Sequence, residues 1–307
     1  MHDSLPRGRR PTWARARAAV LSVGAIVTLG SFAMANRADQ TAVPTTTTTT
    51  AVPTTTQAPP QAEHPLTVGS WDLVLGEDFS AGELDQETWV TCYWWDDAGC
   101  TIYEQLQWYL PDNVAVADGV LTLSAIREDN EGANGRRHHF SSGMVSTGPA
   151  SYQGTAGLSF THGYVEMRAR VPAGSGLWPS FWMLPTDFES KPEIDIMQVL
   201  GDSPTKLHVH LHTVDATGAV KSYGSGSTES DLSQDWHVYG LLWTNDALVW
   251  YLDGTEVWRY GGGDIPNEPM YLVANLTVGG DYAGPPDPAT AFPATFEIDF
   301  IRIWQQE

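Results

Sequence analysis

The chain has 307 residues, of which 42% are hydrophobic and 11% aromatic, enough for one sandwich-sized domain with a buried core plus appended segments. Its 16 Lys and Arg against 37 Asp and Glu give a formal net charge of −21, which argues against nucleic acid or an anionic membrane as the main partner. A neutral polymer suits this composition better.

Residues 1–35 have the pattern of an export signal. Five arginines precede an uncharged apolar run over residues 18–35: Arg7, Arg9, Arg10, Arg15 and Arg17. The run ends in Ala33-Met34-Ala35, which has the small-x-small form of a signal peptidase site. A run of this length can also just span a bilayer as an uncleaved anchor. We therefore predict a secreted or cell-envelope-attached protein that touches a membrane only if this segment is retained.

Residues 36–63 are rich in Thr and Pro and have almost no large apolar side chain. Such a segment cannot form a core, so we predict a disordered linker. Thr/Pro tracts serve either as extended, O-glycosylated stalks or as ordinary flexible linkers. The globular domain is then expected over residues 64–307.

The chain has only two cysteines, Cys92 and Cys100, which lie close together in the exported part. In an oxidising compartment such a pair favours a local disulfide. No metal-ligand spacing surrounds them, which argues against a metal-bound pair.

Residues 64–307 have the pattern of short strands separated by turns, with no long helical period. Two segments place an Asp-Gly pair between apolar-rich arms, Asp118-Gly119 and Asp253-Gly254, which predicts two β-hairpins. Residues 164–171 alternate between an apolar face that begins at Val165 and a face with Glu166 and two arginines, as a half-buried strand requires. The fold class predicted is all-β, a two-sheet sandwich of the jelly-roll type.

The chain has 13 tryptophans, and several lie beside Gly, Pro or charged residues, among them Trp178 and Trp182. Sugar rings pack their C–H faces on indole, so an acidic, Trp-lined cleft would suit a neutral polysaccharide. For Trp243, Trp250 and Trp304, which lie in strand-like apolar surroundings, a place in the core is favoured instead.

Residues 192–199 place two acids in an apolar strand. Strict alternation puts Glu193 and Asp195 on one face and sends Gln198 to the other. If Met197 is the extra residue of a β-bulge, Gln198 returns to the face of the two acids. An edge strand with solvated acids is the simpler alternative.

Three histidines alternate with apolar residues in the strand that follows, so His208, His210 and His212 share one face and are expected in the same groove. A polar face toward solvent is the alternative. Spaced histidines alone are weak evidence for zinc, since no acidic ligand is evident beside them.

The acidic strand resembles the signature of glycoside hydrolase family 16, Glu-x-Asp-x-x-Glu in its bulged form. The resemblance extends from Trp71 to Trp304 and includes Glu77-Asp78-Phe79 and the segments 105–109, 174–185 and 296–304. It implies a jelly roll with a concave carbohydrate-binding cleft. It also implies retaining endo-action on β-1,3- or mixed-linked glucans or related galactans.

By position in this signature, Glu193 is the nucleophile and Asp195 the residue that hydrogen-bonds it and modulates its charge. Gln198 stands where the acid/base glutamate belongs. Retaining hydrolysis needs two carboxyl groups roughly 5–5.5 Å apart. An amide has no proton to give, so hydrolysis is expected to fall by at least roughly 10²–10⁴-fold.

The resemblance further implies a set of substrate contacts: Gln107, Trp108, Trp178, Trp182, His208 and His212. No cofactor is required. Some family members bind calcium on the convex face through an acid near the C-terminus, and Asp299 occupies the similar position.

The function expected is an exported, monomeric, endo-acting β-glycan hydrolase of retaining type whose partner is a polysaccharide. A non-catalytic β-glucan-binding protein, lectin-like or a sensor, is the alternative. Retention of Glu193 and Asp195 favours the enzyme, whereas Gln198 favours the binding protein. A transglycosylase would need the same acid assistance, so Gln198 weakens that hypothesis equally.

Overall fold

The structure is a computed structural model that describes residues 67–94, 100–102, 104–133 and 135–307. The predicted signal segment (1–35) and Thr/Pro linker (36–63) lie outside the described residues and stay predictions. Within the described part of the chain, no helix has the length and apolar character needed to cross a membrane.

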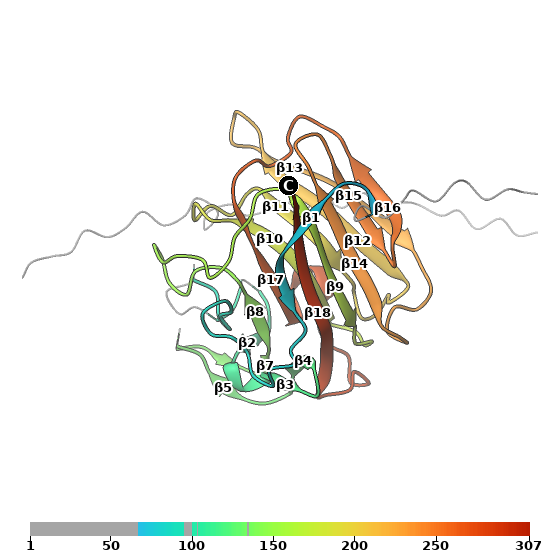
Figure 1. The fold of residues 1–307 in the computed structure, drawn as a ribbon. Helices are drawn as coiled ribbons and strands as arrows, with labels where there is room; N and C mark the ends of the chain where they lie inside the picture. Colours follow the sequence, from blue (N-terminus) through green and yellow to red (C-terminus); the bar gives the residue numbers. More distant parts are fainter. Residues whose placement is uncertain (1–66, 95–99, 103, 134) are drawn as a thin grey trace, which may run out of the picture. The chain divides into compact units, whose positions relative to one another are not determined.

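Two antiparallel sheets stack face to face (Figure 1). The larger sheet has the order β16-β15-β14-β9-β18-β4-β3, with β1 paired to β18. Its strands are β1 (Trp71–Glu77), β3 (Val114–Ala117), β4 (Val120–Ala125), β9 (Gly163–Arg170), β14 (His237–Trp243), β15 (Leu248–Leu252), β16 (Thr255–Tyr260) and β18 (Ala294–Gln306).

The second sheet has six strands in the order β13-β12-β11-β10-β17-β8. They are β8 (Met144–Ser146), β10 (Leu177–Pro185), β11 (Glu193–Gln198), β12 (Lys206–Val214), β13 (Val220–Thr228) and β17 (Met270–Val278). The strand with the two predicted catalytic acids, β11, therefore lies inside a sheet rather than at its edge.

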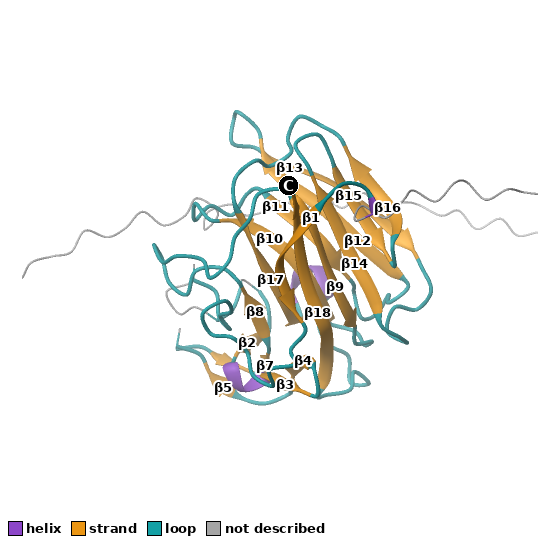
Figure 2. Ribbon diagram, in the orientation of Figure 1, coloured by secondary structure: helices purple, strands orange, loops and turns teal. Residues whose placement is uncertain are grey.

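Short elements complete the described chain, and strands and loops account for nearly all of it (Figure 2). Two small ladders join β2 (Gln107–Tyr109) to β7 (Phe140–Ser142) and β5 (Asn130–Glu131) to β6 (Arg137–His138). The helical pieces are a 3-10 turn, η3 (Pro111–Asn113), and one turn of helix, α1 (Gly280–Ala283). The predicted all-β class is confirmed.

Both predicted hairpins are present, as β3–β4 and β15–β16. Asp118 and Gly119 have φ of 52° and 74°, and Asp253 and Gly254 have φ of 50° and 77°. Two successive positive φ values are the requirement of the tight two-residue hairpin turn, which explains the Asp-Gly pairs.

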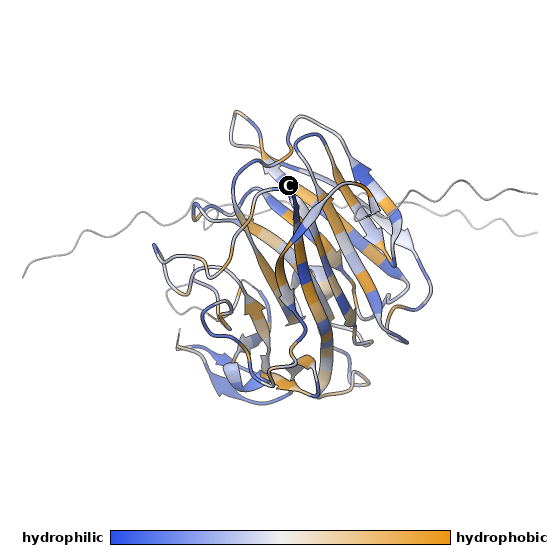
Figure 3. Cartoon of the chain, viewed as in Figure 1, coloured by the Kyte–Doolittle hydropathy of each residue, from blue (hydrophilic) through white to orange (hydrophobic). Residues whose placement is uncertain are grey.

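The main core lies between the two sheets and draws buried side chains from both, such as Met167 of β9 and Ile194 of β11. Alternation of apolar and polar residues along the strands produces this layer, as the bands on β18 show (Figure 3). Because Ile194 points into the core, its neighbours Glu193 and Asp195 point out of the opposite face of their sheet.

The outer face of β9 differs from the expectation of a half-buried strand. Val165 faces the core as predicted, but Tyr164 is also fully buried and Glu166 nearly so. A second apolar cluster covers this face, in which Tyr164 packs against Tyr251 and Trp304. The alternation in the sequence identified the strand. It did not predict the aromatic side chains that bury its polar face.

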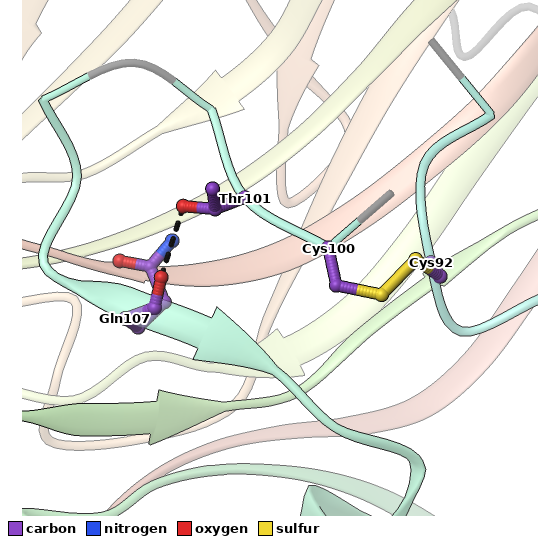
Figure 4. The surroundings of a disulfide bond; sticks show 4 residues. All are labelled: Cys92, Cys100, Thr101 and Gln107. Atoms are coloured by element: carbon purple, nitrogen blue, oxygen red, sulfur yellow. Dashed lines mark hydrogen bonds between the residues drawn. A yellow bond between two sulfur atoms is a disulfide. The ribbon is translucent and has the colours of Figure 1, made fainter. Parts of the chain in front are cut away.

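The predicted disulfide between Cys92 and Cys100 is present (Figure 4). The segment after it is fastened to β2, because Thr101 Oγ1 donates a hydrogen bond to the carbonyl oxygen of Gln107 at 2.9 Å, and Tyr109 N donates to Cys100 O at 2.8 Å. This arrangement fixes Ile102 beside the pocket described below.

Trp250 connects the two sheets through the core. Its side chain on β15 is fully buried, and its Nε1–H donates to the backbone oxygen of Asp195 on β11 at 2.9 Å. Trp243 on β14 is equally buried and donates in the same way to Pro266 O at 2.9 Å, away from β11.

Trp250→Phe is expected to lower the free energy of unfolding by about 1–3 kcal/mol, because Asp195 O loses its buried donor. Trp243→Phe is the matched control and should cost a similar amount. Urea unfolding measures both losses, and amide hydrogen exchange locates them. Only Trp250→Phe should speed amide exchange in β11. Equal exchange rates in β11 for the two variants would contradict a specific role of Trp250 in holding this strand.

Candidate active site

A bulge in β11 brings the three predicted catalytic positions to one face. Toward β12, Asp195 pairs with His210 and Gln198 pairs with His208, so two residues of β11 oppose one of β12. Ile196 and Met197 are both buried in the core, which returns Gln198 to the outer face. The predicted bulge is confirmed, although the ladder to β10 skips Ile196 rather than Met197.

A pocket of about 190 Å³ lies on the outer face of the six-stranded sheet. Glu193, Asp195 and Gln198 form its floor. Its walls come from β10, β17 and the preceding loops: Tyr93, Ile102, Gln105, Trp178, Ser180, Trp182, Asn275 and Thr277. Two of the predicted sugar-contacting tryptophans, Trp178 and Trp182, therefore line the same pocket as the acids.

Glu193 is partly exposed and paired with a lysine. Lys191 Nζ donates to Glu193 Oε2 at 2.6 Å, and both side chains are about one-fifth exposed (20% and 20%). The ammonium occupies one of the two carboxylate oxygens. Oε1 lies on the side of His212, whose Nε2 is 3.9 Å away.

Asp195 is almost completely buried, at 1% exposure, and its Oδ1 has no hydrogen-bond partner. Burial and the negative charge of Glu193 raise the pKa of Asp195 to about 6, against the opposing effect of His212. The closest cationic group is His212 Nε2, at 3.2 Å from Asp195 Oδ2. Asp195 is therefore the acid in this pocket whose protonation changes closest to neutral pH.

The three histidines of β12 lie beside β11 in register: His212 opposite Glu193, His210 opposite Asp195 and His208 opposite Gln198. Burial lowers the pKa of His212, but the carboxylates of Asp195 and Glu193 raise it by more, so its pKa is raised. Burial and the neighbouring histidines lower the pKa of His210 to about 4. Burial, with Lys206, also lowers the pKa of His208.

The surroundings of Gln198 contain donors rather than acids. Ser180 on β10 pairs with Gln198 across the ladder, and its Oγ has no hydrogen-bond partner. Trp178 Nε1, also in the pocket wall, has none either. These two groups are suited to sugar hydroxyls. Neither can supply a proton at neutral pH.

An aromatic side chain borders this end of the site. Tyr282 in α1 packs edge-to-face on Trp178, with ring centroids 5.0 Å apart, and on His208 at 6.1 Å. Burial and the charge of Asp195 raise its pKa above the ordinary value, so its phenol is protonated and a poor acid at neutral pH.

Gln107 and Trp108 do not lie where the resemblance implied. Gln107 is fully buried, where its Oε1 accepts from Val278 N and its Nε2 donates to Gln105 Oε1. Trp108 is 5% exposed and packs on His138. Gln105, which precedes β2, lines the pocket instead, and Gln107 Nε2 holds its side-chain oxygen.

Asp299 has a different partner from the one implied. Its Oδ2 accepts from Arg168 Nη1 at 2.7 Å, so a guanidinium already neutralises the carboxylate. No cluster of three or more potential metal ligands surrounds it among the described residues. The calcium site at Asp299 stays a prediction.

Several pocket residues were missed in the sequence although a signal existed for some of them. Ser180 lies between Trp178 and Trp182 at a spacing of two residues, so strand alternation alone would have placed it on the pocket face. Lys191 lies outside β11, and the contact with Glu193 is seen only in the structure. Asn275 had no such signal. It enters because β17 pairs with β10, where it accepts from Trp182 Nε1 at 2.7 Å.

Comparison with known proteins identifies the same region. The family model described as glycosyl hydrolases family 16 matches residues 108–302. The chain is 32% identical over 251 residues to the endo-1,3-1,4-beta-glycanase EglC of Rhizobium meliloti, covering 75% of this chain and 51% of that protein. It is 30% identical over 263 residues to a beta-glucanase of Rhodothermus marinus, covering 76% and 85%.

The fold agrees with a solved relative. The crystal structure of an endo-beta-1,3-glucanase from Pyrococcus furiosus is 28% identical, with a TM-score of 0.66 over 81% of this chain and 98% of that one. The predicted jelly-roll sandwich is thereby confirmed. The chain spans about half the length of EglC (51%).

Asp195→Asn is expected to stabilise the protein at pH 7.5 in chelator-treated buffer. Because folding raises the pKa of Asp195 from 3.8 to about 6, its ionisation opposes folding above pH 6 and has no effect below pH 4. The gain is at most about 3 kcal/mol, from roughly 1.4 kcal/mol per pKa unit, and should shrink to zero between pH 6 and pH 4.

Thermal unfolding from pH 3.5 to 8 measures this gain. Asp299→Asn is the matched control: it breaks the ion pair to Arg168, so it should give no gain at any pH. A gain for Asp195→Asn that persists unchanged at pH 4 would contradict the assigned electrostatic cost.

Proposed function

The chain belongs to the glycosyl hydrolases of family 16, and from that premise we propose that it is an exported, endo-acting hydrolase of β-1,3- or mixed-linked glucan with an impaired proton-transfer step. The observation that supports this most is the shared face of Glu193, Asp195 and Gln198 in one Trp-lined pocket. The nucleophile position holds a glutamate paired with Lys191, whereas the acid/base position holds an amide.

Glu193 is assigned the nucleophilic attack. Its Oε2 is held by Lys191, so Oε1 is the oxygen that forms the bond to the anomeric carbon while the glycosidic C–O bond breaks. Asp195 lies beside it and, through His212, adjusts the charge felt by the carboxylate. Trp178 and Trp182 supply apolar surface for sugar rings on either side of Ser180.

The departing glycosidic oxygen must gain a proton. Gln198 can donate a hydrogen bond to it from the amide nitrogen, but it keeps its own proton. The neighbouring His208 and Tyr282 have pKa values shifted away from neutrality, His208 downward and Tyr282 upward. Neither group is therefore suited to replace the missing general acid beside the glycosidic oxygen, so proton transfer to the leaving sugar is the impaired step.

A glucan-binding protein without turnover is the second candidate, because Gln198 also suits a site that only holds its ligand. The pocket keeps the tryptophans and the unpaired donors Ser180 Oγ and Trp178 Nε1, which serve binding whether or not a bond breaks. The two candidates differ in what Gln198→Glu does.

Gln198→Glu should raise hydrolysis of laminarin and mixed-linked glucan by roughly 10²–10⁴-fold, because a carboxyl group regains the proton-transfer role. Release of reducing sugar measures it. Gln105→Glu is the matched control, since it adds a carboxyl group elsewhere in the same pocket and should give no gain.

Glu193→Gln added to Gln198→Glu should abolish the gain. If Gln198→Glu binds these glucans but still releases no product, the hydrolase proposal is wrong and the glucan-binding candidate replaces it.

A further inference from the structure

A group of metal-ligating side chains lies on the outer face of β11 and β12. Asp195, His210 and His212 each offer one ligand atom, and these atoms lie within 4.8 Å of one another. The sequence showed spaced histidines without an acidic ligand, and the neighbouring strand now supplies that ligand in Asp195. Among the described residues, no other group of three or more such side chains was found.

The ligand atoms are unusually poor in partners for their depth. Asp195 is 1% exposed, and its Oδ2 has one close polar partner, His212 Nε2 at 3.2 Å. Asp195 Oδ1 and His210 Nδ1 are buried without a hydrogen bond. Buried polar atoms in folded proteins almost always have partners, because leaving them unpaired is costly. A cation between these three atoms would satisfy Asp195 and His210 together.

The spacing suits a small divalent transition-metal ion. Zinc bonds of about 2.0–2.1 Å in a tetrahedral arrangement place ligand atoms about 3.3 Å apart. Asp195 Oδ2 lies 3.2 Å from His212 Nε2 and 3.7 Å from His210 Nδ1. All three ligand atoms lie within 4.8 Å of one another, so the imidazoles need to move inward to reach tetrahedral spacing.

A side chain on the neighbouring strand holds the imidazole of His212 in position. Its Nδ1 lies 2.7 Å from Ser222 Oγ on β13. Its Nε2 faces Asp195 Oδ2 at 3.2 Å, where a bound ion would take the place of the Nε2 proton. Metal-binding histidines typically have their second nitrogen held by such a partner. The fourth position faces Glu193, whose Oε1 is 3.9 Å from His212 Nε2.

We propose that Asp195, His210 and His212 form a binding site for a zinc-class divalent ion, and that the bound ion blocks the pocket. The ion takes imidazole nitrogens and one carboxylate oxygen as ligands and leaves its fourth position toward Glu193 Oε1. A carboxylate oxygen bound to the ion cannot attack a sugar. The binding part of the proposal is independent of the proposed function, whereas the blocking part rests on it.

Isothermal titration of the chelator-treated full chain with zinc chloride tests the binding part. One ion per chain is expected, and His210→Ala and His212→Ala should each weaken the affinity by at least tenfold. His208→Ala is the matched control on the same strand face, outside the cluster, and should keep the affinity. Cobalt(II) added in place of zinc should give the visible absorption of a tetrahedral ion, and His210→Ala should remove it.

His210→Gln and His212→Gln replace the alanine variants if those fail to give the thermal unfolding transition of the unaltered chain. No binding at 100 µM zinc would overturn the proposal. Binding that the substitutions at His210 and His212 leave unchanged would overturn it too. The second result would place zinc at a surface pair such as Asp129 and His139 instead.

The blocking part is measured on Gln198→Glu, the form expected to turn over glucan. Stoichiometric zinc should inhibit it, and a chelator should restore it. Zinc binding to the cluster without inhibition would overturn the blocking part alone. If Gln198→Glu has no activity, displacement of a bound laminarin oligosaccharide by zinc tests blocking of the pocket without turnover. Failure of zinc to displace the oligosaccharide would contradict the blocking part.

Discussion

The bulge at Ile196 and Met197 determines what the pocket contains. A regular strand would point Gln198 into the core, whereas two successive inward residues return it to the face of Glu193 and Asp195. The carbonyl of Asp195, next to the bulge, accepts from Trp250 of the opposite sheet. The arrangement of the site therefore depends on core packing as much as on the residues that line the pocket.

Charge in the pocket is concentrated at the Glu193 end. Lys191 pairs with Glu193, and His212 lies near both Glu193 and Asp195. Burial and the charge of Glu193 raise the pKa of Asp195, and the two carboxylates raise that of His212. Around Gln198 the structure offers an amide, a hydroxyl and an indole. One end can form a covalent bond to sugar, while the other can only hold it. The same crowded end is where a cation would be most favourable.

The sequence predicted much of this arrangement because simple periodicities apply to it. The Asp-Gly turns, the disulfide and the shared face of Glu193 and Asp195 follow from local rules, and all are present. Gln107 and Trp108 were misplaced because burial from a neighbouring segment cannot be deduced from one strand. Asn275 joins the pocket and Arg168 joins Asp299 because strands distant in sequence pair with each other. The register of such pairing cannot be deduced from a single sequence.

The central claim is that Glu193 is a working nucleophile in a site whose acid/base position holds the amide of Gln198. The most direct measurement is intact mass spectrometry after incubation with a 2-deoxy-2-fluoro-β-laminaribioside that has a dinitrophenyl leaving group, which needs no proton to depart. The account predicts a stable adduct of one fluorinated laminaribiosyl group. Peptide digestion should map the adduct to Glu193, and it should be absent in Glu193→Gln. No adduct on the unaltered chain, under conditions where Gln198→Glu is labelled, would contradict the account, as would an adduct on another residue.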